Sequence, residues 1–271
     1  MFARRLTFLN KLQGKVIVIT GASGGIGKEV AIQSAKQGGR LVLLARSMDK
    51  LLQLKNELIT QYGIDAYAYK LDVADTDQVT NVFNDIHAQI GEVDVLVNNA
   101  GFGTFKEAQD TELNETKAMF AVNVIGLMAC TKLVLPYMKQ RKSGHIINIA
   151  SQAGKIATPK STLYSSTKFA VLGYSNALRL ELMEDHVFVT TVNPGPIETN
   201  FFNIADESGT YLKNVEKFML KPGDVAAKIV AAMLTNKREI NLPGWMNFAG
   251  KWYNMFPKIT ETLGKKAFFK K

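Results

Sequence analysis

The chain has 271 residues and an apolar content of 46%, so it can bury a large core within a single domain. Its one cysteine, Cys130, excludes an internal disulfide framework and fits a reducing compartment, and its three histidines lack the spacing of metal ligands, so we expect no metal site. No apolar run approaches the roughly 20 residues that span a bilayer, and residues 1–12 lack a secretory signal, which predicts a cytoplasmic protein.

The formal net charge of +9 lies at the two ends of the chain. Residues 1–15 carry four basic residues and no acid, and residues 244–271 carry six lysines against Glu261. These two segments account for the whole excess, so the body between them is formally neutral. A neutral body without a recognised binding motif argues against nucleic-acid binding.

Seven short runs rich in leucine or β-branched residues predict buried strands. They cover residues 16–20, 41–45, 66–71, 93–97, 145–150, 187–192 and 239–242. The stretches between them carry apolar residues at helical spacing. Alternating strands and helices predict a doubly wound α/β fold with a parallel sheet, in which ligands bind beyond the carboxyl ends of the strands.

The first predicted strand runs directly into a glycine-rich loop at the start of a helix. Glycines 21, 25 and 27 permit positive φ angles and close approach of the backbone, while the helix N-terminus offers free N–H groups to a pyrophosphate. Ala22 and Glu29 break the pattern of a triphosphate-binding loop. We therefore expect a dinucleotide site here, with a purely structural turn as the alternative.

Arg46 follows the second predicted strand, where an NAD enzyme would place an acid on the ribose 2′-hydroxyl. An arginine there can pair with a 2′-phosphate, which favours NADP(H) over NAD(H). The alternative is a solvated arginine at a turn. Asp72 follows the third strand and the sequence Asn-Asn-Ala-Gly at 98–101 follows the fourth, and these small polar residues suit a flat ligand.

Tyr164 and Lys168 stand four residues apart in a predicted helix, shortly after Ser151 at the end of a predicted strand. Residues at this spacing share one helix face, so the ammonium can lie near the phenol and lower its pKa from about 10. Such a tyrosine can exchange protons near neutral pH. The alternative is an aromatic ring covered by a lysine stem on a solvated helix.

Taken in order, these motifs resemble the short-chain dehydrogenase/reductases. The resemblance runs from about residue 14 to 242 and rests on Thr-Gly-x-x-x-Gly-Ile-Gly at 20–27, Asn-Asn-Ala-Gly, Ser151, Tyr-x-x-x-Lys and Pro194-Gly195. It implies one Rossmann-like domain, residues 1–243, with a seven-stranded sheet. It also implies an oxidoreductase that moves a hydride between a nicotinamide and a carbonyl or alcohol, working as a homodimer or homotetramer.

The resemblance implies a role for each matching residue. Tyr164 would protonate the carbonyl oxygen, Ser151 would hydrogen-bond it, Lys168 would hold the ribose and Asn123 would hold a water. The residues expected to contact the cofactor are Gly21, Ser23, Gly24, Gly25, Ile26, Gly27, Arg46, Asp72, Val73, Asn99, Ala100, Gly101, Tyr164, Lys168, Pro194, Gly195, Ile197 and Thr199. The chain departs from many NADP-dependent members, because no basic residue stands within its glycine loop.

Two segments near the end of the chain bear on the substrate and on partners. The segment 196–221 contains Phe201, Phe202, Tyr211, Leu212, Phe218 and Met219, which predicts a lid over an apolar substrate. The extension 244–271 is aromatic and basic, and Pro257 is expected to split it into two short helices. It would pack on the domain, on a neighbouring subunit, which we expect first, or peripherally on an anionic membrane.

A non-enzymatic dinucleotide-binding regulator or scaffold of the same fold is the alternative function. A regulator has no need of Ser151, Tyr164, Lys168 and Asn123 together, whereas a reductase does. Among enzymes, a 3-oxoacyl thioester reductase and a steroid or lipid carbonyl reductase both fit the residues.

Overall fold

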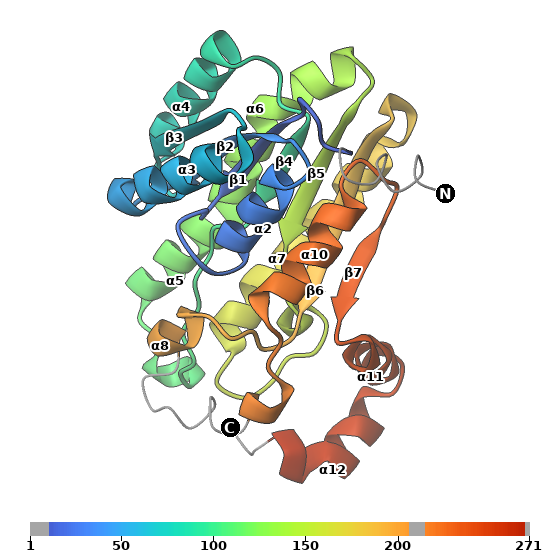
Figure 1. Ribbon diagram of the computed structural model, residues 1–271. Helices are drawn as coiled ribbons and strands as arrows, with labels where there is room; N and C mark the ends of the chain where they lie inside the picture. Colours follow the sequence, from blue (N-terminus) through green and yellow to red (C-terminus); the bar gives the residue numbers. More distant parts are fainter. Residues whose placement is uncertain (1–10, 206–214, 269–271) are drawn as a thin grey trace.

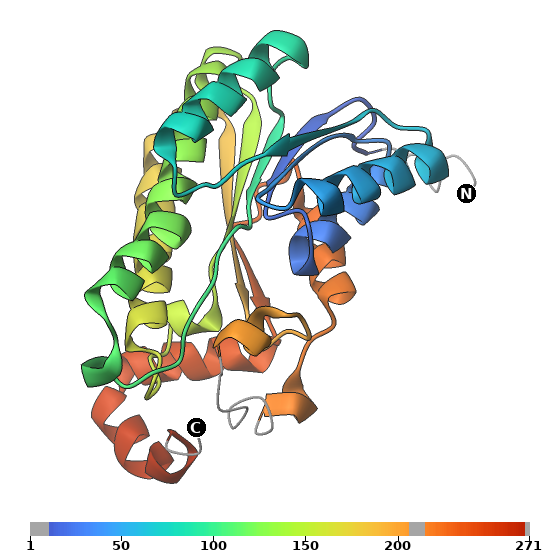
Figure 2. The ribbon, with the colours of Figure 1, turned by 90° about the vertical axis from the view of Figure 1, so that its left-hand side faces the viewer.

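The computed structural model describes residues 11–205 and 215–268 and has three layers, with helices on both faces of a parallel sheet (Figure 1, Figure 2). The strand order is β3-β2-β1-β4-β5-β6-β7, and every neighbouring pair is parallel. The strands are β1 Val16–Thr20, β2 Arg40–Ala45, β3 Ala66–Lys70, β4 Val95–Asn98, β5 Gly144–Ile149, β6 Val187–Pro194 and β7 Glu239–Leu242. The predicted seven-stranded Rossmann-like fold is confirmed.

The helices divide between the two faces of the sheet. One face is covered by α2 (Gly25–Ala35), α3 (Met48–Tyr62) and α10 (Pro222–Ala232), and the other by α4 (Thr76–Gln89), α6 (Leu127–Gln140) and α7 (Thr162–Glu181). Successive side chains of a strand point to opposite faces. Ile17 and Ile19 accordingly join the core on one side, and Val16 and Val18 the core on the other.

The stretch Leu113–Gln140 is helical throughout and combines α5 (Leu113–Phe120), a π-helical turn η2 (Ala121–Gly126) and α6. It is long and apolar enough, by length and composition, to cross a membrane, and its most apolar 18-residue window has a mean hydropathy of 1.9. The prediction that no apolar stretch approaches this length was therefore wrong. Because 44% of its most apolar window is buried and α6 packs in the core, this helix is weak evidence for a membrane span.

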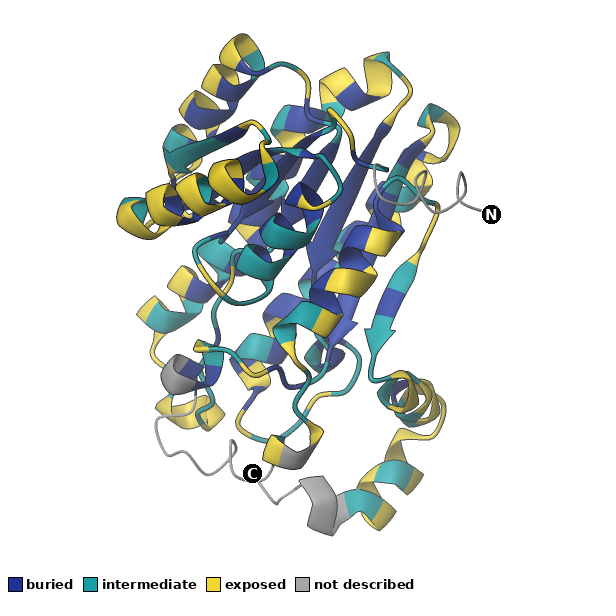
Figure 3. Ribbon diagram, in the orientation of Figure 1, coloured by how far each residue is buried: buried dark blue, intermediate teal, exposed yellow. Residues whose placement is uncertain are grey.

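The end of the chain forms two helices beyond the carboxyl end of β7, α11 (Gly244–Met255) and α12 (Pro257–Phe268), as the position of Pro257 predicts (Figure 1). Proline at the first helical position lacks only an N–H that has no partner within the helix. Figure 3 shows that the described side chains of both helices are largely exposed or half-buried. The short helix α8 (Phe201–Ala205) also lies at this end of the molecule.

Candidate active site

The loop after β1 forms a close-fitting glycine cradle at the start of α2. Gly21 and Gly25 have φ angles of +65° and +54°, which side chains with a Cβ rarely adopt. A Cβ on Gly27 would lie 2.4 Å from the carbonyl oxygen of Gly21. The loop is therefore tightly packed where it enters the N-terminus of α2, and a ligand can approach its backbone there. Thr199, in the segment after β6, also borders the loop, because its Cγ2 would lie 3.3 Å from a Cβ on Gly25.

The loop after β4 is tied to this cradle through Thr20. The Thr20 hydroxyl accepts hydrogen bonds of 3.0 Å from the backbone N–H groups of Asn99 and Ala100. The Asn99 side-chain amide donates to the carbonyl oxygens of Thr20 and Gly21 at 2.9 and 3.1 Å. Thr20 was not among the predicted site residues, although its place at the end of the strand before a glycine is a usable signal.

Arg46 lies exposed just after β2, beside the glycine loop. The backbone N–H of Ala22 donates to the carbonyl of Leu44 at 3.1 Å, which fixes the loop against this strand end. Asp72 lies just after the adjacent strand β3, half-buried, and its carboxylate accepts a hydrogen bond from the Ala74 N–H at 3.0 Å. The fold thus puts the predicted residues for a 2′-phosphate and an adenine on neighbouring strand ends.

Lys168 is buried within α7, with its Nζ 5.7 Å from the centre of the Tyr164 ring. The ammonium donates a hydrogen bond of 2.9 Å to the carbonyl oxygen of Ile149, the last residue of β5. Burial away from water disfavours the charged form and lowers the pKa of Lys168 to about 8. The predicted pairing of these two residues on one helix face is therefore present.

Asn123 lies in the π-helical turn η2, where its side chain is buried. Its amide donates to the Phe102 carbonyl at 2.8 Å and to the Thr167 hydroxyl at 3.1 Å, and its oxygen accepts from the Phe102 N–H at 3.0 Å. A Cβ on Gly101 would lie 3.0 Å from the Asn123 oxygen and 3.7 Å from the Lys168 ammonium. Single π-helical turns are frequent at functional sites.

Ser151 follows β5 with extended backbone and begins a short 3-10 turn. Its hydroxyl oxygen accepts from the Ala153 N–H at 3.0 Å and lies 3.5 Å from the carbonyl oxygen of Pro194. Because β5 and β6 are neighbours, the predicted serine and the predicted Pro194-Gly195 segment meet. Gln152 reinforces this contact by donating to the Asn193 carbonyl at 2.8 Å.

An aromatic cluster covers Tyr164. The rings of Phe201 and Phe105 lie 5.5 and 6.0 Å from the Tyr164 ring, and Phe202 packs on both phenylalanines. Gly103 allows this approach, since a Cβ there would lie 2.7 Å from the tyrosine ring. Phe105 was not predicted, because nothing in its local sequence signals contact with residues about sixty positions away.

Ile197 and Phe218 of the segment 196–221 make other contacts. Ile197 is buried and pairs with Leu220 in a parallel bridge, which holds the two ends of the segment together. Phe218 is exposed and its ring lies 6.4 Å from that of Trp245. Tyr211 and Leu212 lie outside the described residues.

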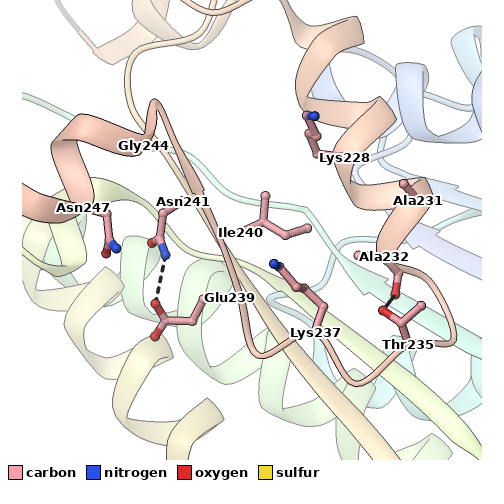
Figure 4. Close-up of a pocket in the computed structure, with 10 residues that line it drawn as sticks. All are labelled: Lys228, Ala231, Ala232, Thr235, Lys237, Glu239, Ile240, Asn241, Gly244 and Asn247. Carbon is pink, nitrogen blue, oxygen red and sulfur yellow. Dashed lines mark hydrogen bonds between the residues drawn. The ribbon is translucent and has the colours of Figure 1, made fainter.

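Within residues 11–205 and 215–268 no group of histidine, cysteine and carboxylate side chains is arranged to hold a metal ion. An open hollow of about 510 Å³ lies between α10, β7 and α11 (Figure 4). Lys228, Lys237, Glu239, Asn241 and Asn247 are among its lining residues, none of which is a predicted site residue.

A buried lysine beside a tyrosine, a serine just after β5 and a glycine cradle after β1 are the arrangement predicted for a dinucleotide-dependent oxidoreductase. The short chain dehydrogenase family matches this sequence over residues 15–208. The chain belongs to that family.

Characterised relatives of the chain share most of its length. The NADP-dependent 3-hydroxy acid dehydrogenase of Schizosaccharomyces pombe is 34% identical over 233 residues, covering 83% of this chain and 89% of the relative. The 3-ketodihydrosphingosine reductase of Bos taurus is 36% identical over 227 residues, covering 81% and 68%. The structure of an alcohol dehydrogenase from Thermococcus sibiricus complexed with 5-hydroxy-NADP has a TM-score of 0.77 and 30% identity, covering 85% and 96%.

Proposed function

We propose that this protein is an NADP(H)-dependent oxidoreductase that interconverts an apolar carbonyl compound and its alcohol. The observation that carries the proposal is the buried Lys168 ammonium 5.7 Å from the Tyr164 ring, at the strand end that also presents Ser151. We expect the enzyme to work in the cytoplasm, and the family resemblance implies a homodimer or homotetramer.

The residues around the glycine loop fit a nicotinamide dinucleotide. The positive φ angles of Gly21 and Gly25 shape the loop at the N-terminus of α2, where the free backbone N–H groups of a helix can bind a pyrophosphate. Arg46 would hold a 2′-phosphate through a charge-assisted hydrogen bond, and Asp72 would contact the adenine end. When bound, the nicotinamide supplies or accepts the hydride. Relatives whose names include NADP support the preference for this cofactor.

Residues of the chain itself would transfer the proton. In the reducing direction, the Tyr164 phenol donates its proton to the substrate oxygen, and the Ser151 hydroxyl donates a hydrogen bond to the same oxygen. The Lys168 ammonium supplies positive potential that favours the phenolate left behind. Asn123 fixes the backbone at Phe102 and donates to the hydroxyl of Thr167, the residue before Lys168.

The substrate side of Tyr164 is apolar. Phe105, Phe201 and Phe202 present ring carbons rather than charges or hydrogen-bond donors beside the phenol. A hydrocarbon group next to the carbonyl gains from burial against these rings, whereas a charged group would lose its hydration. This arrangement favours an apolar ketone, aldehyde or secondary alcohol.

The test is NADPH oxidation over carbonyl compounds of increasing apolar size, run beside NADH, with Tyr164→Phe as the key variant. Tyr164→Phe is expected to lower kcat about 10³-fold, because general acid catalysis is lost, while the Kd for NADPH changes little. Tyr137→Phe removes a hydroxyl from a partly exposed ring of α6 and serves as the matched control. Undiminished reduction by Tyr164→Phe would refute the mechanism, and NADPH binding without turnover of any carbonyl would favour the regulator.

A further inference from the structure

The two C-terminal helices carry a row of exposed apolar side chains, which we call the tail face. It consists of Trp245, Phe248, Trp252, Met255, Ile259 and Leu263. The exposed fraction reaches 71% at Phe248 and 83% at Leu263, so these side chains are not part of the core. Soluble monomers rarely expose a contiguous apolar surface of this kind, and such a surface marks an interaction site.

The geometry makes the tail face one surface rather than scattered residues. Trp245, Phe248, Trp252 and Met255 are spaced three, four and three residues apart, so they line one side of α11. The Tyr253 hydroxyl donates to the Glu261 carboxylate at 3.0 Å, which ties α11 to α12. This hydrogen bond holds the two helices that carry the tail face together.

Lysines accompany the tail face along both helices. Lys251 and Lys258 are exposed beside it, and residues 244–271 contain six lysines against Glu261. An apolar stripe with tryptophans and lysines at its border is the composition of a helix that lies in the interface of a membrane. Each lysine near an anionic lipid surface contributes favourable electrostatic energy.

The tail face also lies next to Phe218 in the segment 196–221. The rings of Trp245 and Phe218 lie 6.4 Å apart, and Phe218 is itself 57% exposed. On the inner side of α11, the sulfur of Met246 would lie 2.9 Å from a Cβ on Gly195, beside the predicted nicotinamide contacts. A surface that engages the tail face therefore lies close to Phe218.

We propose that the tail face binds the surface of an anionic phospholipid membrane, with α11 and α12 lying in the plane of the interface. A second copy of the chain is the competing occupant. In a two-fold contact through the tail face, the exposed Lys251 and Lys258 of one copy would lie near those of the other, and like charges across an interface are repulsive. Anionic lipid headgroups instead complement this charge.

The test is flotation of the full-length protein with vesicles of phosphatidylcholine and phosphatidylglycerol, compared with vesicles of phosphatidylcholine alone. The protein is expected to float with the anionic vesicles, more weakly at high salt, because screening reduces the attraction. Lys251→Glu combined with Lys258→Glu is expected to lower the bound fraction at least about tenfold. Failure of the unaltered protein to float with anionic vesicles would overturn the proposal.

A paired comparison of apolar substitutions isolates the tail face. Phe248→Ser with Leu263→Ser is expected to weaken vesicle binding at least about tenfold, because two exposed apolar side chains can no longer be buried. Leu180→Ser with Met183→Ser removes side chains that are 65% and 68% exposed elsewhere, and is expected to leave binding unchanged. Equal loss in both pairs would overturn the proposal.

Two further measurements complete the test. Unchanged thermal unfolding of the Phe248→Ser, Leu263→Ser variant establishes that loss of flotation is not loss of folding. Light scattering without lipid compares the oligomer size of this variant with that of the unaltered protein. A smaller oligomer in the variant, together with no flotation of the unaltered protein, would identify a contact between subunits and overturn the proposal. Flotation needs no turnover, so its result is independent of the proposed reaction.

Discussion

The Lys155 ammonium lies 2.6 Å from the Glu239 carboxylate, and this ion pair joins the segment after Ser151 to the first residue of β7. The side chains are 14% and 27% exposed. The same ammonium donates to the Asn247 side chain of α11 at 3.0 Å. One nitrogen thus connects the active-site segment, the last strand and the C-terminal extension, and Glu239 and Asn247 both border the hollow in Figure 4.

Lys155→Met is expected to lower the free energy of unfolding by about 1 to 3 kcal/mol, because Glu239 loses its partner while partly buried. Urea denaturation measures this change. Lys139→Met is the matched control. Lys139 also pairs with a carboxylate, that of Asp185, but its side chain is 49% exposed, so the substitution should lower the free energy of unfolding by less than about 0.5 kcal/mol. Equal losses in the two variants would contradict a structural role for the Lys155 contact.

The same contact predicts a pH dependence. Burial raises the pKa of Glu239, but hydrogen bonds from Lys155 and Asn241 and the nearby positive charges lower it by more, so the net pKa is lowered. A lowered carboxyl pKa contributes stability above its unfolded value near about 4.3 and loses it as pH falls through the folded value. The stability difference between the unaltered protein and Lys155→Met should therefore shrink in acid. A constant difference down to acid pH would be inconsistent with this origin.

Lys168→Met is expected to stabilise the cofactor-free protein while abolishing turnover. Burial lowers the Lys168 pKa from 10.5 to about 8. This shift destabilises the folded protein by about 3 kcal/mol while the lysine is protonated in both the folded and the unfolded state. The variant removes that cost but loses the hydrogen bond to the Ile149 carbonyl, which offsets about 1 kcal/mol. The net gain at pH 7 is about 2 kcal/mol. It should vanish as pH rises from 8 to 10.5, because the folded lysine then releases its proton and the cost disappears. Chemical denaturation of both proteins across this range checks the sign.

Gly27→Ala and Gly24→Ala form a matched pair within the glycine loop. The Gly27 Cβ would lie 2.4 Å from a backbone oxygen, so the first variant should lose about 1 to 3 kcal/mol of unfolding free energy. Gly24 is exposed with extended backbone and nothing within 4 Å of an added Cβ, so the second should change stability by less than about 0.5 kcal/mol. Urea denaturation without cofactor measures both, and a tolerated Gly27→Ala would contradict the close-fitting cradle.

Arg46→Ala tests the cofactor preference. The variant should raise the Kd for NADPH about 10- to 100-fold and leave that for NADH nearly unchanged, since only the former carries a 2′-phosphate for a charge-assisted bond. Fluorescence titration with both dinucleotides measures the ratio. Lys36→Ala, an exposed cation at the far end of α2, controls for the overall loss of positive charge. Equal weakening of both cofactors by Arg46→Ala would argue against the 2′-phosphate contact.

The strands, the order of the motifs and most of the candidate site could be predicted from the sequence, because these features depend on local patterns. Each strand lies within two residues of its predicted bounds, since buried parallel strands are continuous apolar runs. The glycines at 21 and 25 have the positive φ angles that their loop predicts. Tyr164 and Lys168 share a helix face because their spacing is nearly one helical turn.

Other features depend on contacts between segments far apart in the chain, which no local pattern specifies. Phe105 reaches Tyr164, and Lys155 reaches Glu239 across 84 positions, only because the sheet order brings their loops together. The π-helical turn that orients Asn123 likewise lies where α5 passes into α6 beside α7. From the sequence alone we could predict which residues carry the proposed chemistry, whereas the packing of the parallel strands decides what surrounds them. Packing also leaves the tail face uncovered, because the core is already filled on both sides of the sheet.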